Sequence, residues 1–182
     1  GKVVLVGPSA AGKSSILYRF EIDQFEIDSP TTLTASFLNK NFEYKGQMVD
    51  LNFWDTAGQE RFNAVSATYF RNAHIVLVCF DISDLNSFNQ MKFWVNQAKA
   101  KTDVNTKKII VGNKCDKIES RAIQQHHFEE FMQTIEKTDD EFDYIETSAK
   151  TGYGIKELFF KILNIYLKCQ RKSEVSELIN IE

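Results

Sequence analysis

Short apolar runs and longer amphipathic stretches alternate along most of this chain. The apolar runs have the length and composition of strands buried in a parallel sheet, and they occupy residues 2–6, 75–80, 108–111 and 142–145. The stretches after them predict helices, at residues 14–20, 83–101, 122–136 and 155–168. This order is typical of an α/β fold joined by right-handed crossovers.

One part of the chain departs from that order. Residues 35–44 and 47–54 both alternate apolar and polar positions, and they flank Lys45 and Gly46, a pair typical of a hairpin turn. We therefore expect a six-stranded, mostly parallel sheet in which the hairpin supplies one antiparallel edge strand. Helices should cover both faces of this sheet.

The loop between the first strand and the first helix carries GPSAAGKS, which fits the phosphate-binding pattern GxxxxGK[ST]. Its glycines let the backbone wrap closely around phosphates, and the next helix directs its N-terminus at the same negative charge. Lys13 would reach the terminal phosphates, and the Ser14 hydroxyl would bind a magnesium ion. The nucleotide-binding residues expected here are Ser9, Ala10, Ala11, Gly12, Lys13, Ser14 and Ser15. In this context the pattern predicts a P-loop NTPase fold.

A second motif, DTAGQE, begins where the second strand of the hairpin ends. Asp55 can hold a magnesium ion through water, and Gly58 is small enough to offer its N–H to a terminal phosphate. Gln59 is then placed to orient an attacking water. The predicted catalytic residues are therefore Gln59 and Lys13, and Ser14 and Asp55 are predicted metal ligands.

Two further motifs, NKCD and TSAK, follow the last two predicted strands. The Asp116 carboxylate accepts two N–H donors, which guanine presents and adenine does not. Asn113 would tie this loop to the phosphate loop, and the aliphatic stem of Lys114 would pack on the base. The nucleotide-binding residues expected in the TSAK segment, a lid under the base, are Ser148, Ala149 and Lys150. Since the carboxyl ends of parallel strands meet at one edge, the four motifs predict one site.

Composition narrows the class of protein. With 182 residues the chain fits one domain, and a formal net charge of -3 gives no electrostatic reason to expect a nucleic-acid partner. We therefore assign no nucleic acid. Three cysteines without a close pair indicate neither a disulfide framework nor a zinc site, and no apolar run approaches the roughly 18 residues needed to span a bilayer. We expect a protein of the reducing cytoplasm.

With these motifs in hand, the chain resembles a small GTPase of the Ras superfamily over residues 2–166. The sequence WDTAGQERF at 54–62 resembles the Rab branch. Residues 32–38 and the pair Ser9-Ala10 are similar to Rabs of the early-endosomal type. The resemblance implies a GTP-binding and GTP-hydrolysing switch that regulates vesicle trafficking by recruiting effectors in its GTP state, with slow hydrolysis unless an activating protein helps.

The resemblance also assigns roles that spacing alone does not. Phe25 would stack edge-on against guanine, Thr32 would bind the magnesium ion and sense the third phosphate, and Ala149 would offer its N–H to the guanine oxygen. Three aromatic residues match the surface that Rabs present to effectors: Phe37, Trp54 and Tyr69. The alternative for these three is simple packing, and we expect both roles together, since aromatic residues at interfaces serve packing too.

The implied ligands are Mg²⁺ and GTP or GDP, and the implied partners are an exchange factor, a GTPase-activating protein and effectors. We expect a cytoplasmic protein, peripheral on endosomal or other vesicle membranes. Membrane contact would come only from partners or from a lipidated tail absent here, because Cys169 is not a prenylation cysteine. Residues 1–170 would form the GTPase domain, and 171–182 either a short docked helix or a disordered tail. The chain would then be a shortened form or one domain of a longer protein.

Two other functions stay open. Thr34 stands where the family has glycine, which supports a guanine-nucleotide scaffold with negligible hydrolysis, although Gln59 and Thr32 count against it. A P-loop kinase would share the first motif. It would leave the DTAGQE, NKCD and TSAK segments without an explanation.

Overall fold

A six-stranded sheet forms the centre of the molecule, with the strand order β2-β3-β1-β4-β5-β6. The computed structural model describes residues 1–25, 36–56, 68–135 and 142–179, with side chains up to residue 171. The strands are β1 (Lys2–Val6), β2 (Ser36–Tyr44), β3 (Gln47–Asp55), β4 (Ile75–Asp81), β5 (Lys107–Asn113) and β6 (Phe142–Glu146). β2 and β3 pair antiparallel, and the other neighbouring strands pair parallel. The predicted sheet and its antiparallel edge strand are confirmed.

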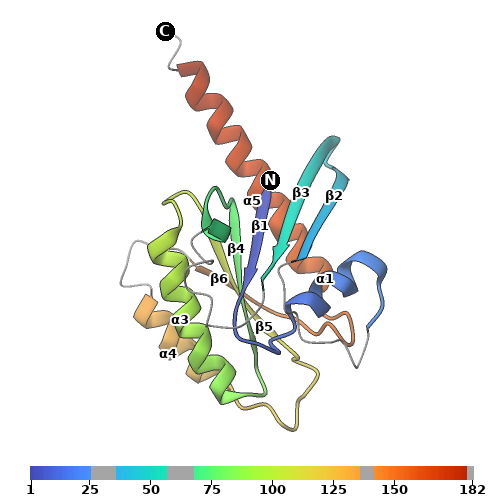
Figure 1. Cartoon of the computed structure of the whole chain (residues 1–182), viewed down its shortest axis with the longest axis vertical. Coiled ribbons are helices and arrows are strands. Elements are labelled where there is room, and N and C mark those ends of the chain that lie inside the picture. Colours follow the sequence, from blue (N-terminus) through green and yellow to red (C-terminus); the bar gives the residue numbers. More distant parts are fainter. Residues whose placement is uncertain (26–35, 57–67, 136–141, 180–182) are drawn as a thin grey trace.

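Helices cover both faces of this sheet (Figure 1). They are α1 (Lys13–Ile22), α3 (Leu85–Lys101), α4 (Gln125–Ile135) and α5 (Ile155–Ile179). Alternate residues of β1 divide between the two layers: Val3 and Leu5 pack in the cluster with α1 and α5, whereas Val4 and Val6 pack in the cluster with α3 and α4. Burial on both faces explains why the central strands read as unbroken apolar runs.

The strands end where polar residues take over from the apolar runs. β3, β4, β5 and β6 each extend one or two residues beyond the predicted strand, closing with Asp55, Asp81, Asn113 and Glu146. β1 lies between β3 and β4, so the chain passes first to one side of β1 and then to the other. In open α/β sheets ligands bind beyond the carboxyl ends of the strands at such a reversal. These polar ends therefore surround the expected binding edge.

All four helices differ from their predicted bounds: α1 is longer by one residue at its start and two at its end, and α4 begins at Gln125 rather than near Ala122. α3 begins at Leu85 rather than near Ser83, because the Asp84 side chain accepts the N–H of Asn86 at 2.8 Å and caps the helix. α5 continues to Ile179, past the predicted end at Lys168, since neither glycine nor proline interrupts residues 155–179. Within the described part of the chain, no helix has the length and the apolar character that a membrane crossing requires.

Candidate nucleotide-binding site

The phosphate loop leaves β1 and turns sharply into α1. Gly7 and Gly12 adopt φ values of 140° and 87°, where a side chain would be strained. A Cβ atom on Gly7 would strike the carbonyl oxygen of Cys79 in β4, and one on Gly12 would strike the side-chain amide of Asn113. The two glycines therefore let the loop lie directly against the ends of β4 and β5.

Lys13 is buried beneath this loop, with 5% of its surface exposed. Its Nζ donates to the carbonyl oxygens of Gly7 at 3.0 Å and Pro8 at 2.9 Å. Burial lowers the pKa of Lys13 below its ordinary value, while the nearby Asp55 carboxylate opposes that shift. The cation is thus held at the inner side of a loop whose backbone can bind phosphate.

Asp55, at the end of β3, joins the phosphate loop through Ser14. The Ser14 hydroxyl donates to Asp55 Oδ2 at 2.5 Å, and Ser36 lies 3.4 Å from the same oxygen. Burial raises the pKa of Asp55, and the hydrogen bond from Ser14 opposes that rise. Among the described residues, Asp55 Oδ1 is buried without a hydrogen-bond partner. A carboxylate oxygen lacking a partner beside a serine hydroxyl suits a hard divalent cation that prefers oxygen ligands.

Asn113, at the end of β5, connects three segments of the site. Its Nδ2 donates to Ala11 O in the phosphate loop at 3.0 Å. Its Oδ1 accepts from the Thr147 hydroxyl and from the N–H of Ala149, both at 3.2 Å. The residue is 1% exposed. The phosphate loop, the NKCD segment and the TSAK segment are therefore joined through one buried side chain.

Replacing Asn113 by Ala is expected to lower the free energy of unfolding by roughly 2–4 kcal/mol, because it leaves several buried polar groups without partners. The measurement is urea unfolding followed by tryptophan fluorescence. Asn39→Ala is the matched control, since Asn39 also bonds through its side chain, to Asp50 and Asn52, but is exposed. The control should change stability by less than about 0.5 kcal/mol, and an equally small loss in Asn113→Ala would contradict the linking role.

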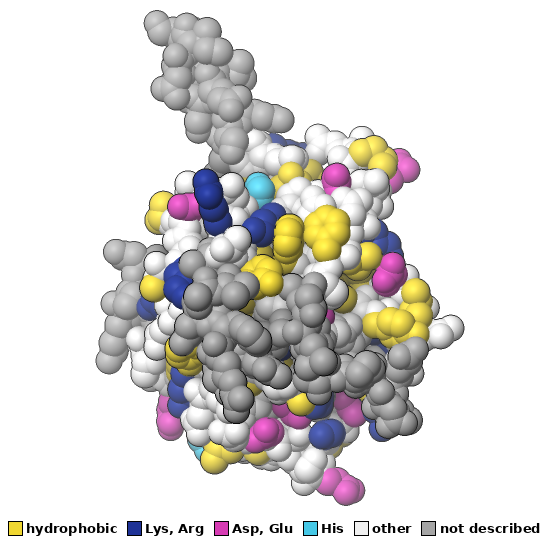
Figure 2. Space-filling view, viewed as in Figure 1, with side chains coloured by type: hydrophobic (Ala, Val, Ile, Leu, Met, Phe, Trp, Pro, Cys, Tyr) yellow, Lys and Arg dark blue, Asp and Glu magenta, His cyan; other side chains and the backbone are white. Residues whose placement is uncertain are grey.

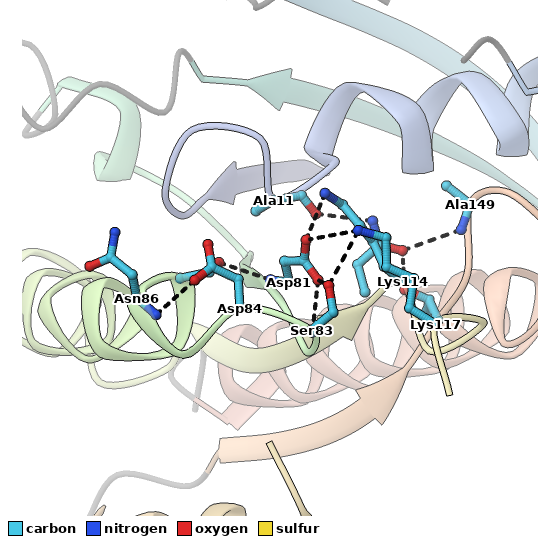
Figure 3. Close-up of polar contacts among 11 residues, drawn as sticks. Ala11, Asp81, Ser83, Asp84, Asn86, Lys114, Lys117 and Ala149 are labelled. Carbon is cyan, nitrogen blue, oxygen red and sulfur yellow. Dashed lines mark hydrogen bonds and ion pairs between the residues drawn. The ribbon is translucent and has the colours of Figure 1, made fainter. Parts of the chain in front are cut away.

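The side of the site that is predicted to recognise the base is built from the ends of β5 and β6 and the loops after them, and Figure 3 shows Lys114 and Ala149 there. Asp116 Oδ1 accepts from the Ser148 hydroxyl at 2.6 Å. Lys114 adopts a left-handed backbone with φ of 65°, and its Nζ lies 2.8 Å from Asp81 Oδ2. The Ala149 N–H, expected on a guanine oxygen, donates to Asn113 here. The Ser148 hydroxyl thus orients the Asp116 carboxylate.

Comparison with known proteins identifies the family of this chain. A model of the Ras family matches residues 2–168. The chain belongs to the Ras family. It is 33% identical over 175 residues to "GTP-binding protein YPTM1" of Zea mays, an alignment that covers 96% of this chain and 82% of that protein. It is 35% identical over 161 residues to "Ras-related protein Rab-22A" of Homo sapiens, covering 88% and 80%. "Ras-related protein RABA5d" of Arabidopsis thaliana is 35% identical over 182 residues, covering 100% and 81%.

The remaining predicted residues of this Ras-family protein fall into two groups. Ser9 and Ala10 lie exposed on the phosphate loop, Ser15 is half-buried, Lys150 is exposed, and half-buried Phe25 packs beside the cluster of α1 and α5. Three predicted residues lie outside the described part of the chain: Thr32, Gly58 and Gln59.

The three aromatic residues predicted to form an effector surface meet in a row. The rings of Phe37 and Trp54 are 5.2 Å apart, and those of Trp54 and Tyr69 are 6.3 Å apart. Phe37 remains 56% exposed, although Trp54 and Tyr69 also pack beside the core cluster of α3 and α4. Hydrophobic side chains gather on the face that carries the β2–β3 hairpin (Figure 2). Packing and exposure therefore coexist in this Ras-family protein.

Two site residues of this Ras-family protein were missed by the sequence analysis. Asp81 binds Lys114, and it closes β4 as Asp55 closes β3, directly after the apolar run predicted at residues 75–80. Arg19 on α1 donates through Nε to Ala149 O at 2.7 Å and through Nη2 to Lys150 O at 2.5 Å. Arg19 also binds Asp23, four residues on at the end of α1, but nothing local marks its bonds to the TSAK segment, which lies far along the chain.

Proposed function

We propose that this Ras-family protein is a GTP-binding and GTP-hydrolysing switch of the Rab type that acts in membrane trafficking. One observation carries the proposal: Asn113 binds Ala11 in the phosphate loop on one side and Ala149 in the TSAK segment on the other. Residues suited to phosphate and residues suited to a guanine base therefore face one another across a single buried side chain.

Each half of the site has a chemical role in this proposal. Lys13 and the N–H groups of the phosphate loop would stabilise negative charge on the transferring phosphoryl group. Asp116 would accept the two guanine N–H donors, because a carboxylate offers two acceptor oxygens. Lys114 would cover the base with its aliphatic stem. Together they select a guanine nucleotide over an adenine nucleotide.

Ser14 and Asp55 fit a magnesium ion, and Thr32 is the third ligand implied by the Ras-family resemblance. The fit rests on Asp55 Oδ1, which is buried without a hydrogen-bond partner among the described residues, while Oδ2 of the same carboxylate accepts from Ser14. When bound, the ion would neutralise charge on the phosphate oxygens. Ser14 and Asp55 would hold it at the mouth of the phosphate loop.

The Rab assignment rests on sequence and on the aromatic row. Residues 54–62 read WDTAGQERF, as in the Rab branch, and human Rab-22A is 35% identical. Phe37, exposed beside Trp54, offers an apolar group to effectors in the GTP state. An exchange factor and a GTPase-activating protein would set the nucleotide state. Attachment to endosomal or other vesicle membranes would come from a lipidated tail or from partners.

The decisive experiment is to denature the purified protein and identify the released nucleotide by chromatography. Guanine nucleotide near one equivalent is expected, with GDP implying that hydrolysis occurred in the cell. GTP in its place would favour a scaffold over a hydrolase. An empty protein that also fails to bind added guanine nucleotide, or one that carries adenine nucleotide, would refute the proposal.

Gln59→Leu is expected to reduce GTP hydrolysis at least about tenfold while nucleotide affinity stays unchanged, because leucine cannot orient the attacking water. Single-turnover hydrolysis of bound radiolabelled GTP measures the chemical step separately from binding. The matched control is Gln47→Leu, because Gln47 is exposed and begins β3 at the end of the strand opposite to Asp55. Unchanged turnover in Gln59→Leu would remove Gln59 from the proposed chemistry.

A further inference from the structure

At the carboxyl end of β4, the Asp81 carboxylate binds polar groups from two loops. Its Oδ2 lies 2.8 Å from Lys114 Nζ and 3.9 Å from Lys117 Nζ. Its Oδ1 accepts from the backbone N–H of Ser83 at 2.8 Å and from the Ser83 hydroxyl at 2.6 Å. The two carboxylate oxygens therefore have different tasks: one organises the loop after β4, and the other binds lysines of the NKCD loop (Figure 3).

The bond to Lys114 crosses the nucleotide site. Lys114 follows Asn113 directly and has a left-handed backbone with φ of 65°. A Cβ atom built on Gly12 would lie 4.0 Å from Lys114 Cε. The aliphatic stem thus passes beside the phosphate loop before its ammonium group reaches Asp81. Both ends of this side chain are fixed, one by the strand end and one by the carboxylate.

We propose that Asp81 is a positioning residue for the guanine nucleotide: it holds the Lys114 ammonium so that the lysine stem forms a fixed wall of the base pocket. This inference rests on the proposed function. Lysine has a flexible four-carbon stem, and ordering it costs binding free energy unless it is already ordered in the free protein. Asp81 orders it in advance, so the nucleotide stays bound longer.

A role in folding alone is separable from this one. Asn at position 81 retains an oxygen that can accept from Ser83, and the Asp81 backbone N–H still donates to the Ser87 hydroxyl at 2.9 Å. With that oxygen facing Ser83, the NH₂ group of the asparagine takes the place of Oδ2. An NH₂ group is a donor and cannot accept a hydrogen bond from the Lys114 ammonium group. Asp81→Asn therefore removes the link to Lys114 and leaves the loop's own hydrogen bonds.

The experiment measures dissociation of GDP carrying a fluorescent ribose label, with magnesium and excess unlabelled GDP present. Asp81→Asn is expected to dissociate about tenfold faster than wild type, since a hydrogen bond between charged groups is lost. Asp84→Asn is the matched control, because Asp84 lies in the same loop, is exposed, and bonds to Asn86. It should dissociate at the wild-type rate.

Lys114→Met is the second variant, and it keeps an apolar stem while removing the ammonium group. If the stem alone mattered, dissociation would not change; anchoring by Asp81 predicts an acceleration of about tenfold here too. The double variant should dissociate no faster than Lys114→Met, because both changes break one link. Additive acceleration in the double variant, an unchanged rate in either single variant, or an equal acceleration in Asp84→Asn would overturn the inference.

GDP binding by the wild-type protein tests the proposed function, whereas the rate of GDP release from Asp81→Asn tests the role of Asp81. If wild-type protein does not bind labelled GDP, the switch function itself is lost. If wild type binds GDP and releases it slowly while Asp81→Asn releases it at the same rate, only the role of Asp81 is lost.

Discussion

Asp116→Asn is expected to lower the affinity for guanine nucleotides by about three orders of magnitude, since it removes the acceptor for two hydrogen bonds to a charged group. The Ser148 hydroxyl donates to Asp116 Oδ1 at 2.6 Å. An asparagine oxygen would keep that bond, so its NH₂ group would take the place of Oδ2 and face the base. Guanine presents donors there, and two donors oppose each other. Xanthine, with an oxygen at carbon 2, can accept from the new NH₂ group and should become the better ligand.

Competition against a fluorescent nucleotide measures this change, with GTP, xanthosine triphosphate and ATP as competitors. Asp143→Asn is the matched control, because Asp143 is exposed on β6 and pairs with Lys161 at 3.0 Å. The control should keep the wild-type order of preference. Retention of full guanine affinity in Asp116→Asn would show that another group reads the base.

The sheet was predictable because its signal is local. β1 was expected at residues 2–6 and is found at Lys2–Val6, since an apolar strand buried on both faces leaves an uninterrupted run before the glycine loop. The antiparallel edge strand followed from alternation around Lys45 and Gly46. The end of α5 at Ile179 was not predicted, because residues beyond Lys168 are polar yet good helix formers, and polarity alone resembles a tail.

The sequence predicted which residues of the candidate site lie together where a motif lies in one stretch of chain, and less so where residues meet only in the fold. The phosphate loop and the NKCD segment follow directly from strand ends. The bond between Asp81 and Lys114 joins two strand ends that are adjacent only because β4 pairs with β5. Arg19 reaches Ala149 across 130 residues. Such pairs depend on tertiary packing, and no local propensity encodes them.

Lys13→Met is expected to weaken binding of GTP and GDP at least about a hundredfold, because the variant loses the cation that would face the phosphates. Methionine fills a similar volume and has no charge, so it isolates this effect. The free energy of unfolding of the nucleotide-free protein should change by less than about 1.5 kcal/mol. Lys13 Nζ does lose two carbonyl partners, at 3.0 Å and 2.9 Å, but its burial already opposes the charged form.

The loss of nucleotide affinity in Lys13→Met, compared with its loss of folding stability, distinguishes a phosphate-binding role of Lys13 from a structural one. Lys108→Met is the control, since Lys108 is also buried but lies near the start of β5, at the other end of the sheet. Titration of labelled GDP gives the affinity, and urea unfolding without nucleotide gives the stability. A large loss of stability with a small loss of affinity would make Lys13 a structural cap on the Gly7 and Pro8 carbonyls. A large loss of affinity in a stable protein would support Lys13 as the phosphate-binding cation, because its hydrogen bonds to the loop hold it there before the nucleotide arrives.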